Sequence, residues 1–429
     1  MSNLKTIARA LPVAAATGLV AVGSLLAQSA SVAPPSSARI TQEIAWLADD
    51  AREGRGVNTA GLDQAADFIA DAFADIGLEP GGTDGYFQVF QLDPNSPALA
   101  HTDFGGATVK NVVGILRGSG ALASEVVILG AHYDHLGRGD HGYETSSRDT
   151  AKVKGIQNGA DDNASGTAAL IEAARSLAAR TAPDRRTIVF VAFTAEELGA
   201  IGSAYYVEHP ALPIDSTDVM LNFDMVGRLS GDSLTIGGTG SAEELPAVLA
   251  RANRKYRMNL GMQADPWGSS DHAVFYAKGI PVLHFYTQLH QDYHTSADDW
   301  DKINMAGVAE IVGFATDVAW DLATRPEEVT YVAFERPAPP AGGKRASLGT
   351  MPDMVSSGLE GMRVQGVREG TAAAEAGIKA GDIILKIGDV TVKDVYGLQE
   401  ALTTYKTGET VTIVFLRDGQ RMETKATLK

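Results

Sequence analysis

The chain has 429 residues, of which 45% are hydrophobic and 21% charged, with a formal net charge of −17 and no cysteine. This composition can supply a hydrophobic core and argues against a fibrous or mostly disordered protein. An acidic chain repels phosphate backbones, which argues against nucleic-acid binding, and the lack of cysteine excludes disulfides and lipoprotein attachment.

Residues 1–30 have the layout of a secretory signal peptide. Lys5 and Arg9 precede an apolar stretch from Leu11 to Ala27, and small residues follow it. We expect cleavage between Ala27 and Ala33 and therefore export to a bacterial periplasm or the medium, with no stable membrane anchor after cleavage. The alternative is an uncleaved anchor, but the stretch is short and rich in alanine and glycine for a stable span.

Apolar runs alternate with helical patterns through the middle of the chain. The patterns predict helices over 62–76, 163–179, 243–256 and 305–322, and buried strands over 126–129, 187–193, 219–223 and 280–285. Buried strands that alternate with helices predict an α/β fold with a mostly parallel central sheet flanked by helices.

A proline- and glycine-rich stretch from Glu335 to Ser347 indicates a linker between two domains. We therefore expect four parts. They are a signal peptide over 1–30, a large α/β domain over 38–325, a linker over 326–347 and a small α+β domain over 348–429.

Histidines and acids follow the predicted strands at the points where the strands end. In chain order they are His132, Asp134, His135, Glu196, Glu197, Asp224 and His294. A further acidic cluster, GADDNASG at 159–166, opens the helix that begins at Asn163. Because sites in open α/β sheets form outside the carboxyl ends of the strands, we expect these side chains to converge.

Imidazoles combined with carboxylates are a ligand set typical of zinc. There are enough of them for two ions that share a carboxylate, with one more carboxylate left as a general base. Spacing alone leaves open whether Asp161 or Asp162 is the shared ligand. Asp162 also has an alternative role as a helix cap before Asn163.

Five motifs, in this order and spacing, resemble the two-zinc aminopeptidases of peptidase family M28. They are HYDHLG, NGADDNASGTAAL, FTAEELGAIGS, NFDMVG and YHTSADD, and the resemblance covers roughly 40–322. It implies that one zinc is held by His132 and Asp224, and the other by Glu197 and His294. Asp162 would bridge the two ions.

The same resemblance implies a division of labour between the two adjacent glutamates. Glu196 would be the general base, while its neighbour binds metal. Asp134 would orient the ring of His132 from behind. His135 is expected to be a neighbour of the site and not a ligand, and SSDHAVF at 269–275 is expected to form a wall of the site.

Residues 348–429 resemble a PDZ domain of the bacterial protease type, most specifically through AAAEAGIKAGDIILKIGD. Such a domain takes the carboxyl terminus of a peptide as an added strand. The candidate carboxylate loop, Ser347 to Thr350, departs from the usual Gly-Leu-Gly-Phe form. A domain that only packs on the rest of the chain, or has lost peptide binding, therefore stays an alternative.

Together these patterns predict an exported exopeptidase with two zinc ions that removes N-terminal residues from peptides or proteins. One alternative is an envelope scaffold that binds peptides through the PDZ domain. Another is an enzyme with one zinc, as in the glutaminyl cyclases, although the complete set of ligands for two metals argues against it.

Overall fold

The computed structural model describes residues 35–335, apart from 101, 141, 144, 145 and 150–154, and residues 346–429, apart from 353–360, 368, 369, 393, 394 and 418. The predicted signal peptide and the middle of the predicted linker lie outside these residues. No helix within the described part has both the length and the apolar character needed to cross a membrane.

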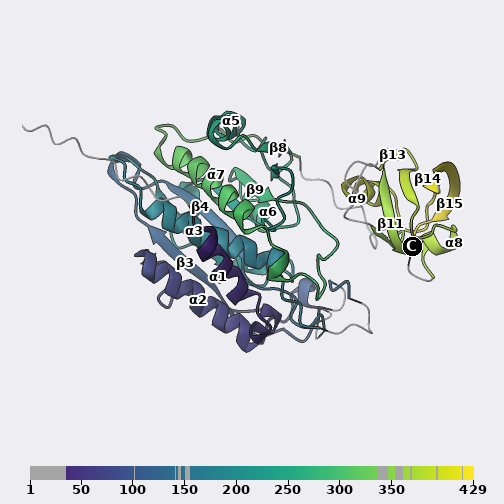
Figure 1. Ribbon diagram of the computed structural model, residues 1–429, viewed down its shortest axis with the longest axis horizontal. Coiled ribbons are helices and arrows are strands. Elements are labelled where there is room, and N and C mark those ends of the chain that lie inside the picture. The colour runs from purple at the N-terminus through teal and green to yellow at the C-terminus, as the bar shows by residue number, and fades with distance from the viewer. Residues whose placement is uncertain are drawn as a thin grey trace, which may run out of the picture. The chain divides into compact units, whose positions relative to one another are not determined.

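The larger domain is built on a nine-stranded sheet in the order β1-β3-β5-β4-β6-β9-β7-β8, with β2 paired to β3 (Figure 1). Its four central strands are parallel, and antiparallel strands flank them on both sides. The strands are β1 Glu79–Pro80, β2 Phe87–Gln91, β3 Thr108–Leu116, β4 Val126–His132, β5 Thr187–Phe193, β6 Thr217–Phe223, β7 Ser233–Gly237, β8 Asn259–Met262 and β9 Val282–Tyr286.

Helices cover both faces of this sheet. One face carries α1 (Ser37–Leu47), α2 (Ala60–Ile76), α3 (Gly166–Ala178) and α7 (Met305–Thr324), and α5 (Leu245–Tyr256) packs against α7. The short helices α4 (Ile201–Glu208) and α6 (His272–Tyr276) pack against the other face. The predicted α/β class is therefore confirmed, and the expected parallel order holds at the centre of the sheet.

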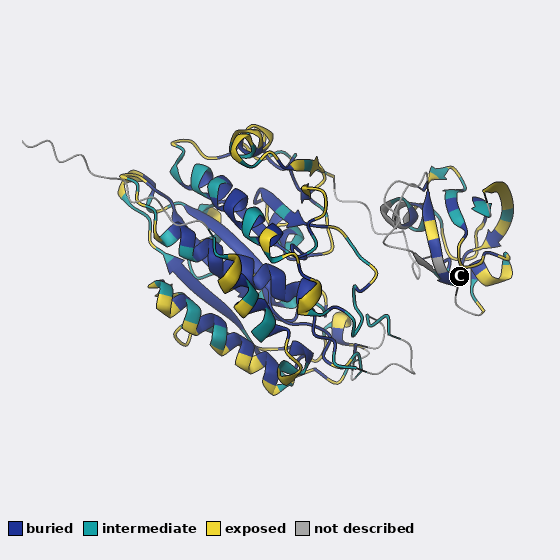
Figure 2. Ribbon diagram, in the orientation of Figure 1, coloured by how far each residue is buried: buried dark blue, intermediate teal, exposed yellow. Residues whose placement is uncertain are grey.

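The domain has two hydrophobic cores, one on each face of the sheet, because successive side chains of a strand point to opposite faces. In β4, Val127 and Leu129 belong to the cluster under α3 and α7, whereas Val126 and Ile128 belong to the cluster under α4 and α6. Every residue of β4 and β5 is buried, as Figure 2 shows for the centre of the sheet. This explains why these strands read as continuous apolar runs in the sequence.

All eight predicted elements are present, with shifts of a few residues at their ends. The clearest shift is at the helix predicted over 163–179, because α3 begins only at Gly166 and the preceding residues, Ala160–Ser165, form an irregular turn. Backbone angles at Asp162 and Asn163 are not helical. This turn presents the acidic cluster at the edge of the sheet instead of winding it into a helix.

The smaller domain has a core and a sheet of its own. The sheet runs β10-β11-β12-β14-β15, with β13 paired to β12, and all its pairs are antiparallel. Its elements are β10 Thr350–Pro352, β11 Met362–Val367, α8 Ala372–Glu375, β12 Ile383–Ile387, β13 Val390–Thr391, α9 Val395–Thr404, β14 Thr410–Arg417 and β15 Gln420–Thr427.

Candidate metal centre

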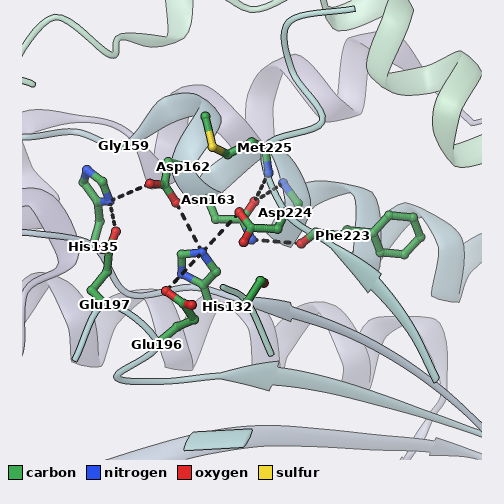
Figure 3. Close-up of polar contacts among 12 residues, drawn as sticks. His132, His135, Gly159, Asp162, Asn163, Glu196, Glu197, Phe223, Asp224 and Met225 are labelled. Atoms are coloured by element: carbon green, nitrogen blue, oxygen red, sulfur yellow. Dashed lines mark hydrogen bonds and ion pairs between the residues drawn. The ribbon is translucent and has the colours of Figure 1, made fainter. Parts of the chain in front are cut away.

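The candidate ligands come from the carboxyl ends of the four central strands. His132 is the last residue of β4, and Asp224 follows β6 directly, where its N–H donates to the carbonyl of Phe285. Glu196 and Glu197 lie in the turn after β5, and His294 lies in the loop after β9. Because β5, β4, β6 and β9 are adjacent and parallel, these ends meet at one edge of the sheet (Figure 3).

Within the described part of the chain, two groups of close ligand atoms share Asp162: His132, Asp162 and Asp224 form one, and His135, Asp162 and Glu197 form the other. His132 Nε2 lies 3.2 Å from Asp162 Oδ1 and 3.4 Å from Asp224 Oδ1. On the other side, His294 Nε2 lies 3.0 Å from Asp162 Oδ2 and 3.2 Å from Glu197 Oε2. The two carboxylate oxygens of Asp162 therefore face different imidazoles: Oδ1 faces His132, which also lies near Asp224, and Oδ2 faces His294, which also lies near Glu197.

The residues present fit zinc in both groups. Each group offers an imidazole nitrogen and carboxylate oxygens, which are ligands that Zn²⁺ accepts, and all of them are largely buried. Asp224 Oδ1 is buried and has no hydrogen-bond partner among the described residues, although it faces His132. A buried carboxylate oxygen of this kind is costly unless a cation completes its surroundings.

Asp161 and Asp162 point to different partners, which separates the two residues that spacing left undecided. Asp161 Oδ1 accepts from the N–H of Gly227 at 2.6 Å and from Ser165 Oγ at 3.1 Å, while Oδ2 lies 3.0 Å from His290 Nε2. Only Asp162 faces both candidate groups. The geometry therefore favours Asp162 as the shared ligand.

His135 lies closer to the centre than the sequence suggested. Its Nδ1 lies 2.7 Å from Glu197 Oε1 and 3.9 Å from Asp162 Oδ2, and its ring is fully buried. In this position it holds one oxygen of Glu197 while the other oxygen faces His294. No signal in the sequence gave this contact, since His135 is separated from Glu197 by a whole strand and helix.

Two buried aspartates hold the turns that carry the acids. The carboxylate of Asp134 accepts from the N–H groups of Glu196, at 3.0 Å, and Glu197, at 3.3 Å. His132 Nδ1 is nearer to the backbone carbonyl of Asp134, at 3.2 Å, than to its carboxylate, at 3.7 Å. Asp134 is thus in reach of His132, but its direct hydrogen bonds fix the glutamate pair.

Asp298 acts in the same way on the acidic turn, a role that the sequence analysis missed. Its Oδ2 accepts from the N–H groups of Asp161, at 2.9 Å, and Asp162, at 3.1 Å. Its Oδ1 accepts from Arg228 Nη2 at 2.8 Å. Its place in YHTSADD, four residues after His294, was the only available signal.

The two adjacent glutamates have opposite electrostatic surroundings. Burial raises the pKa of Glu196 well above its usual range; His132 opposes this shift, and nearby acids, Asp271 among them, add to it. Burial also opposes ionisation of Glu197, but His294 and His135 prevail and lower its pKa to about 2. Neighbouring carboxyls with separated pKa values are typical of sites that divide proton transfer from charge stabilisation.

A pocket of about 520 Å³ opens beside the glutamates and both candidate metal groups. Its walls include Ser270 and His272 of the SSDHAVF segment, as predicted, together with the aromatic rings of Trp267 and Tyr286. The ring of His272 stacks on that of His284 at 4.3 Å, and burial lowers the pKa of both imidazoles. The pocket is thus lined both by acids of the metal groups and by uncharged imidazole and aromatic rings.

Residues 111–318 match the model of peptidase family M28, and residues 346–428 match the model of the PDZ domain. The larger domain is thus similar to peptidase family M28 over residues 111–318. These matches confirm both resemblances, and the ordered strand-end motifs are the features that indicated the first of them.

Curated relatives of the M28 domain include an aminopeptidase, YwaD of Bacillus subtilis, 28% identical over 211 residues that make up 47% of this chain and 42% of the relative. A probable zinc metalloprotease of Leptosphaeria maculans is 31% identical over 293 residues, 60% of this chain and 63% of the relative. The chain thus spans less than two thirds of these relatives. The PDZ region resembles a serine protease Do-like HtrA of Lactococcus lactis, 43% identical over 65 residues, 15% of this chain and 16% of the relative.

Solved structures share the fold. A zinc aminopeptidase from Bacillus subtilis superposes with a TM-score of 0.53 at 19% identity, covering 69% of this chain and 98% of that one. A Zn-dependent exopeptidase from Parabacteroides distasonis gives 0.54 at 19% identity, covering 68% and 100%. At this identity the likeness establishes the architecture, and the chemistry has to be argued from the site.

Proposed function

We propose that the protein is an exported aminopeptidase that holds two zinc ions and removes N-terminal residues from peptides or proteins. The observation that carries this proposal is the shared carboxylate of Asp162, which offers one oxygen to each of two groups of imidazole and acid. The names of the aminopeptidase and metalloprotease relatives support the same class of reaction.

In this proposal His132 and Asp224 would hold one ion, Glu197 and His294 would hold the other, and Asp162 would be shared between them. Zinc held there would supply Lewis acidity, which polarises a peptide carbonyl and makes water more acidic.

Glu196 is the general base. Its Oε2 lies 4.0 Å from His132 Nε2, next to the candidate ligands but in neither group. From there it takes a proton from the attacking water and returns it to the leaving amine. Ala195 has a φ of 55°, which turns the chain at the strand end, so the side chains of Glu196 and Glu197 diverge to these separate tasks.

The test uses the purified mature chain with added zinc, chromogenic aminoacyl substrates and the same substrates with an acetylated amine. We expect turnover of the free amines only, and a metal content near two ions per chain. A content near one would favour the one-zinc alternative, and turnover of the acetylated compounds would refute an aminopeptidase.

Two neighbouring substitutions separate the roles of the glutamates. Glu196→Ala should keep both ions while kcat falls by roughly 10²–10⁴, the usual scale for losing a general base. Glu197→Ala should instead lose zinc from the group that contains His294. Equal loss of metal in both variants would show that the proposed roles of Glu196 as base and Glu197 as ligand are wrong.

We further propose that the PDZ domain binds an extended peptide at the free edge of β10, which pairs only with β11 among the described strands. Gly349 has a φ of 78° just before this strand, and the loop is held by the bond from Ala373 N–H to the carbonyl of Leu348. Fluorescent peptides with free and amidated carboxyl termini test this, because carboxylate capture requires that only the free form binds.

A further inference from the structure

Arg55 is a fully buried cation that none of the five M28 motifs contains. It lies at the end of the turn Asp50–Arg55, between α1 and α2, and has a φ of 47°. Among the described residues it forms no ion pair with a carboxylate. A buried guanidinium without a directly bound acid is costly, so a specific role has to offset that cost.

The guanidinium of Arg55 binds backbone carbonyls on both sides of the metal centre. Nε donates to the carbonyl of Tyr133 at 2.8 Å, between His132 and Asp134. Nη1 donates to the carbonyl of Asn158 at 2.7 Å, and Nη2 to that of Gly159 at 2.8 Å, in the segment that leads into Asp162.

Two more contacts tie this arginine to its surroundings. Nη1 also donates to the carbonyl of Leu47 at 2.7 Å, at the end of α1. The backbone carbonyl of Arg55 accepts from the N–H of His135 at 3.2 Å. One side chain and its own peptide group therefore connect the end of β4 to the acidic turn before α3.

The positive charge of Arg55 also interacts electrostatically with the acids of the candidate metal centre. Burial lowers its pKa to about 10, opposed by Asp134, Asp162 and other acids of the site, so the side chain stays charged at neutral pH. These acids are not bound to it directly, and the arginine acts on them as a fixed positive charge behind the ligand shell.

We propose that Arg55 is a positioning residue of the metal centre, which fixes the distance between the segment of His132 and the turn of Asp162. If these two segments drift apart, Asp162 cannot face both groups at once. This inference rests on the proposed binding of zinc, although it concerns how the chain builds the site and not which substrate is cleaved.

The test compares Arg55→Met with Arg186→Met in the full chain. Arg186 is an equally buried arginine that binds the carbonyls of Leu322 and Arg325, but it precedes β5 at the opposite end of the strands. Each variant is stripped of metal and titrated with zinc against a chromophoric chelator. We expect Arg55→Met to lose zinc affinity by about 10–100-fold, the scale seen when groups behind metal ligands are removed, and Arg186→Met to lose none.

Arg55→Lys keeps the charge but cannot reach all four carbonyls with one nitrogen. It should show an intermediate loss of zinc affinity and, with Co²⁺ in place of zinc, a changed visible absorption spectrum, which reports ligand geometry. If Arg55→Met does not fold, Arg55→Lys decides the question. Wild-type affinity and an unchanged cobalt spectrum would overturn the proposal.

A purely structural role predicts a different result. In that case Arg55→Met and Arg186→Met would both lower the melting temperature of the metal-free chain while zinc affinity stayed the same, and the proposal would be wrong. A chain that binds zinc in an Arg55-dependent way but cleaves no aminoacyl substrate would instead refute the proposed function and leave this inference standing.

Discussion

Asp134→Asn is the substitution that should most directly test how the glutamate pair is held. Asp134 is fully buried, and its two oxygens accept from the N–H groups of Glu196 and Glu197. Asparagine has the same shape, but one of its two positions becomes an NH₂ group that faces an N–H donor. One hydrogen bond to a charged acceptor is lost and the other becomes a neutral bond.

The expected cost follows from these two bonds. A hydrogen bond to a charged group contributes about 1.5–3 kcal/mol and a neutral one about 0.5–1.5 kcal/mol. Losing one charged bond and weakening the other should therefore lower the free energy of unfolding by about 2–4 kcal/mol. Because both glutamates move with their turn, kcat/KM should also fall by about 10–100-fold.

The assay measures urea unfolding and the kcat/KM for an aminoacyl substrate on the same preparations. Asp218→Asn is the matched control, because Asp218 is also buried and accepts from the N–H of Val329 at 2.7 Å, but it lies at the start of β6, away from the site. It should lose stability and keep its kcat/KM. If Asp134→Asn lost stability while its kcat/KM matched the wild type, the reasoning about the turn would be refuted.

Three further predictions concern charge, metal and the smaller domain. Burial, reinforced by Glu172, raises the pKa of Glu43 from 4.5 to about 8, so the folded chain keeps a proton that the unfolded chain has released. This contribution to the free energy of unfolding should fall by up to about 1.4 kcal/mol per pH unit as the pH rises from about 4.5 to about 8, and Glu43→Gln should remove it; parallel urea unfolding curves across that range would contradict this. Asp162→Ala should lower the zinc content of the purified chain while Asp161→Asn keeps it, because only Asp162 faces both groups; metal analysis showing the reverse would move the bridge to Asp161. Asp382→Ala removes the bidentate partner of Arg417 and should destabilise the PDZ domain by about 2–3 kcal/mol without changing turnover of aminoacyl substrates, which two-transition thermal unfolding and kinetics can check.

The sequence predicted the centre of the fold well because burial on both faces leaves a simple pattern. Strands such as β5 are uniformly buried and carry no charge, and the acidic residues that follow β5 mark where the chain leaves the sheet. The parallel order then brings the strand ends together without any knowledge of loops. For this reason the ligand candidates could be named from the sequence.

The parts that the sequence did not predict depend on contacts between distant segments. Nothing near Arg55 indicates that its side chain reaches Tyr133 and Gly159, and nothing near Asp298 indicates that it accepts from the turn of Asp162. The outer strands were also missed, since β8 is largely exposed and lacks a continuous apolar run. Such features depend on tertiary packing, and the local sequence pattern carries no information about contacts between distant segments.

The candidate ligands are spread along the chain from His132 to His294, so an ion bound by them would join segments that meet only after the sheet has formed. It would act as a removable cross-link, because an unfolded chain scatters the same ligands and binds the ion far less well. Stability would then rise with the logarithm of free zinc above the dissociation constant. If the chain is exported as proposed, the concentration of free zinc outside the cell would then set its resistance to proteolysis.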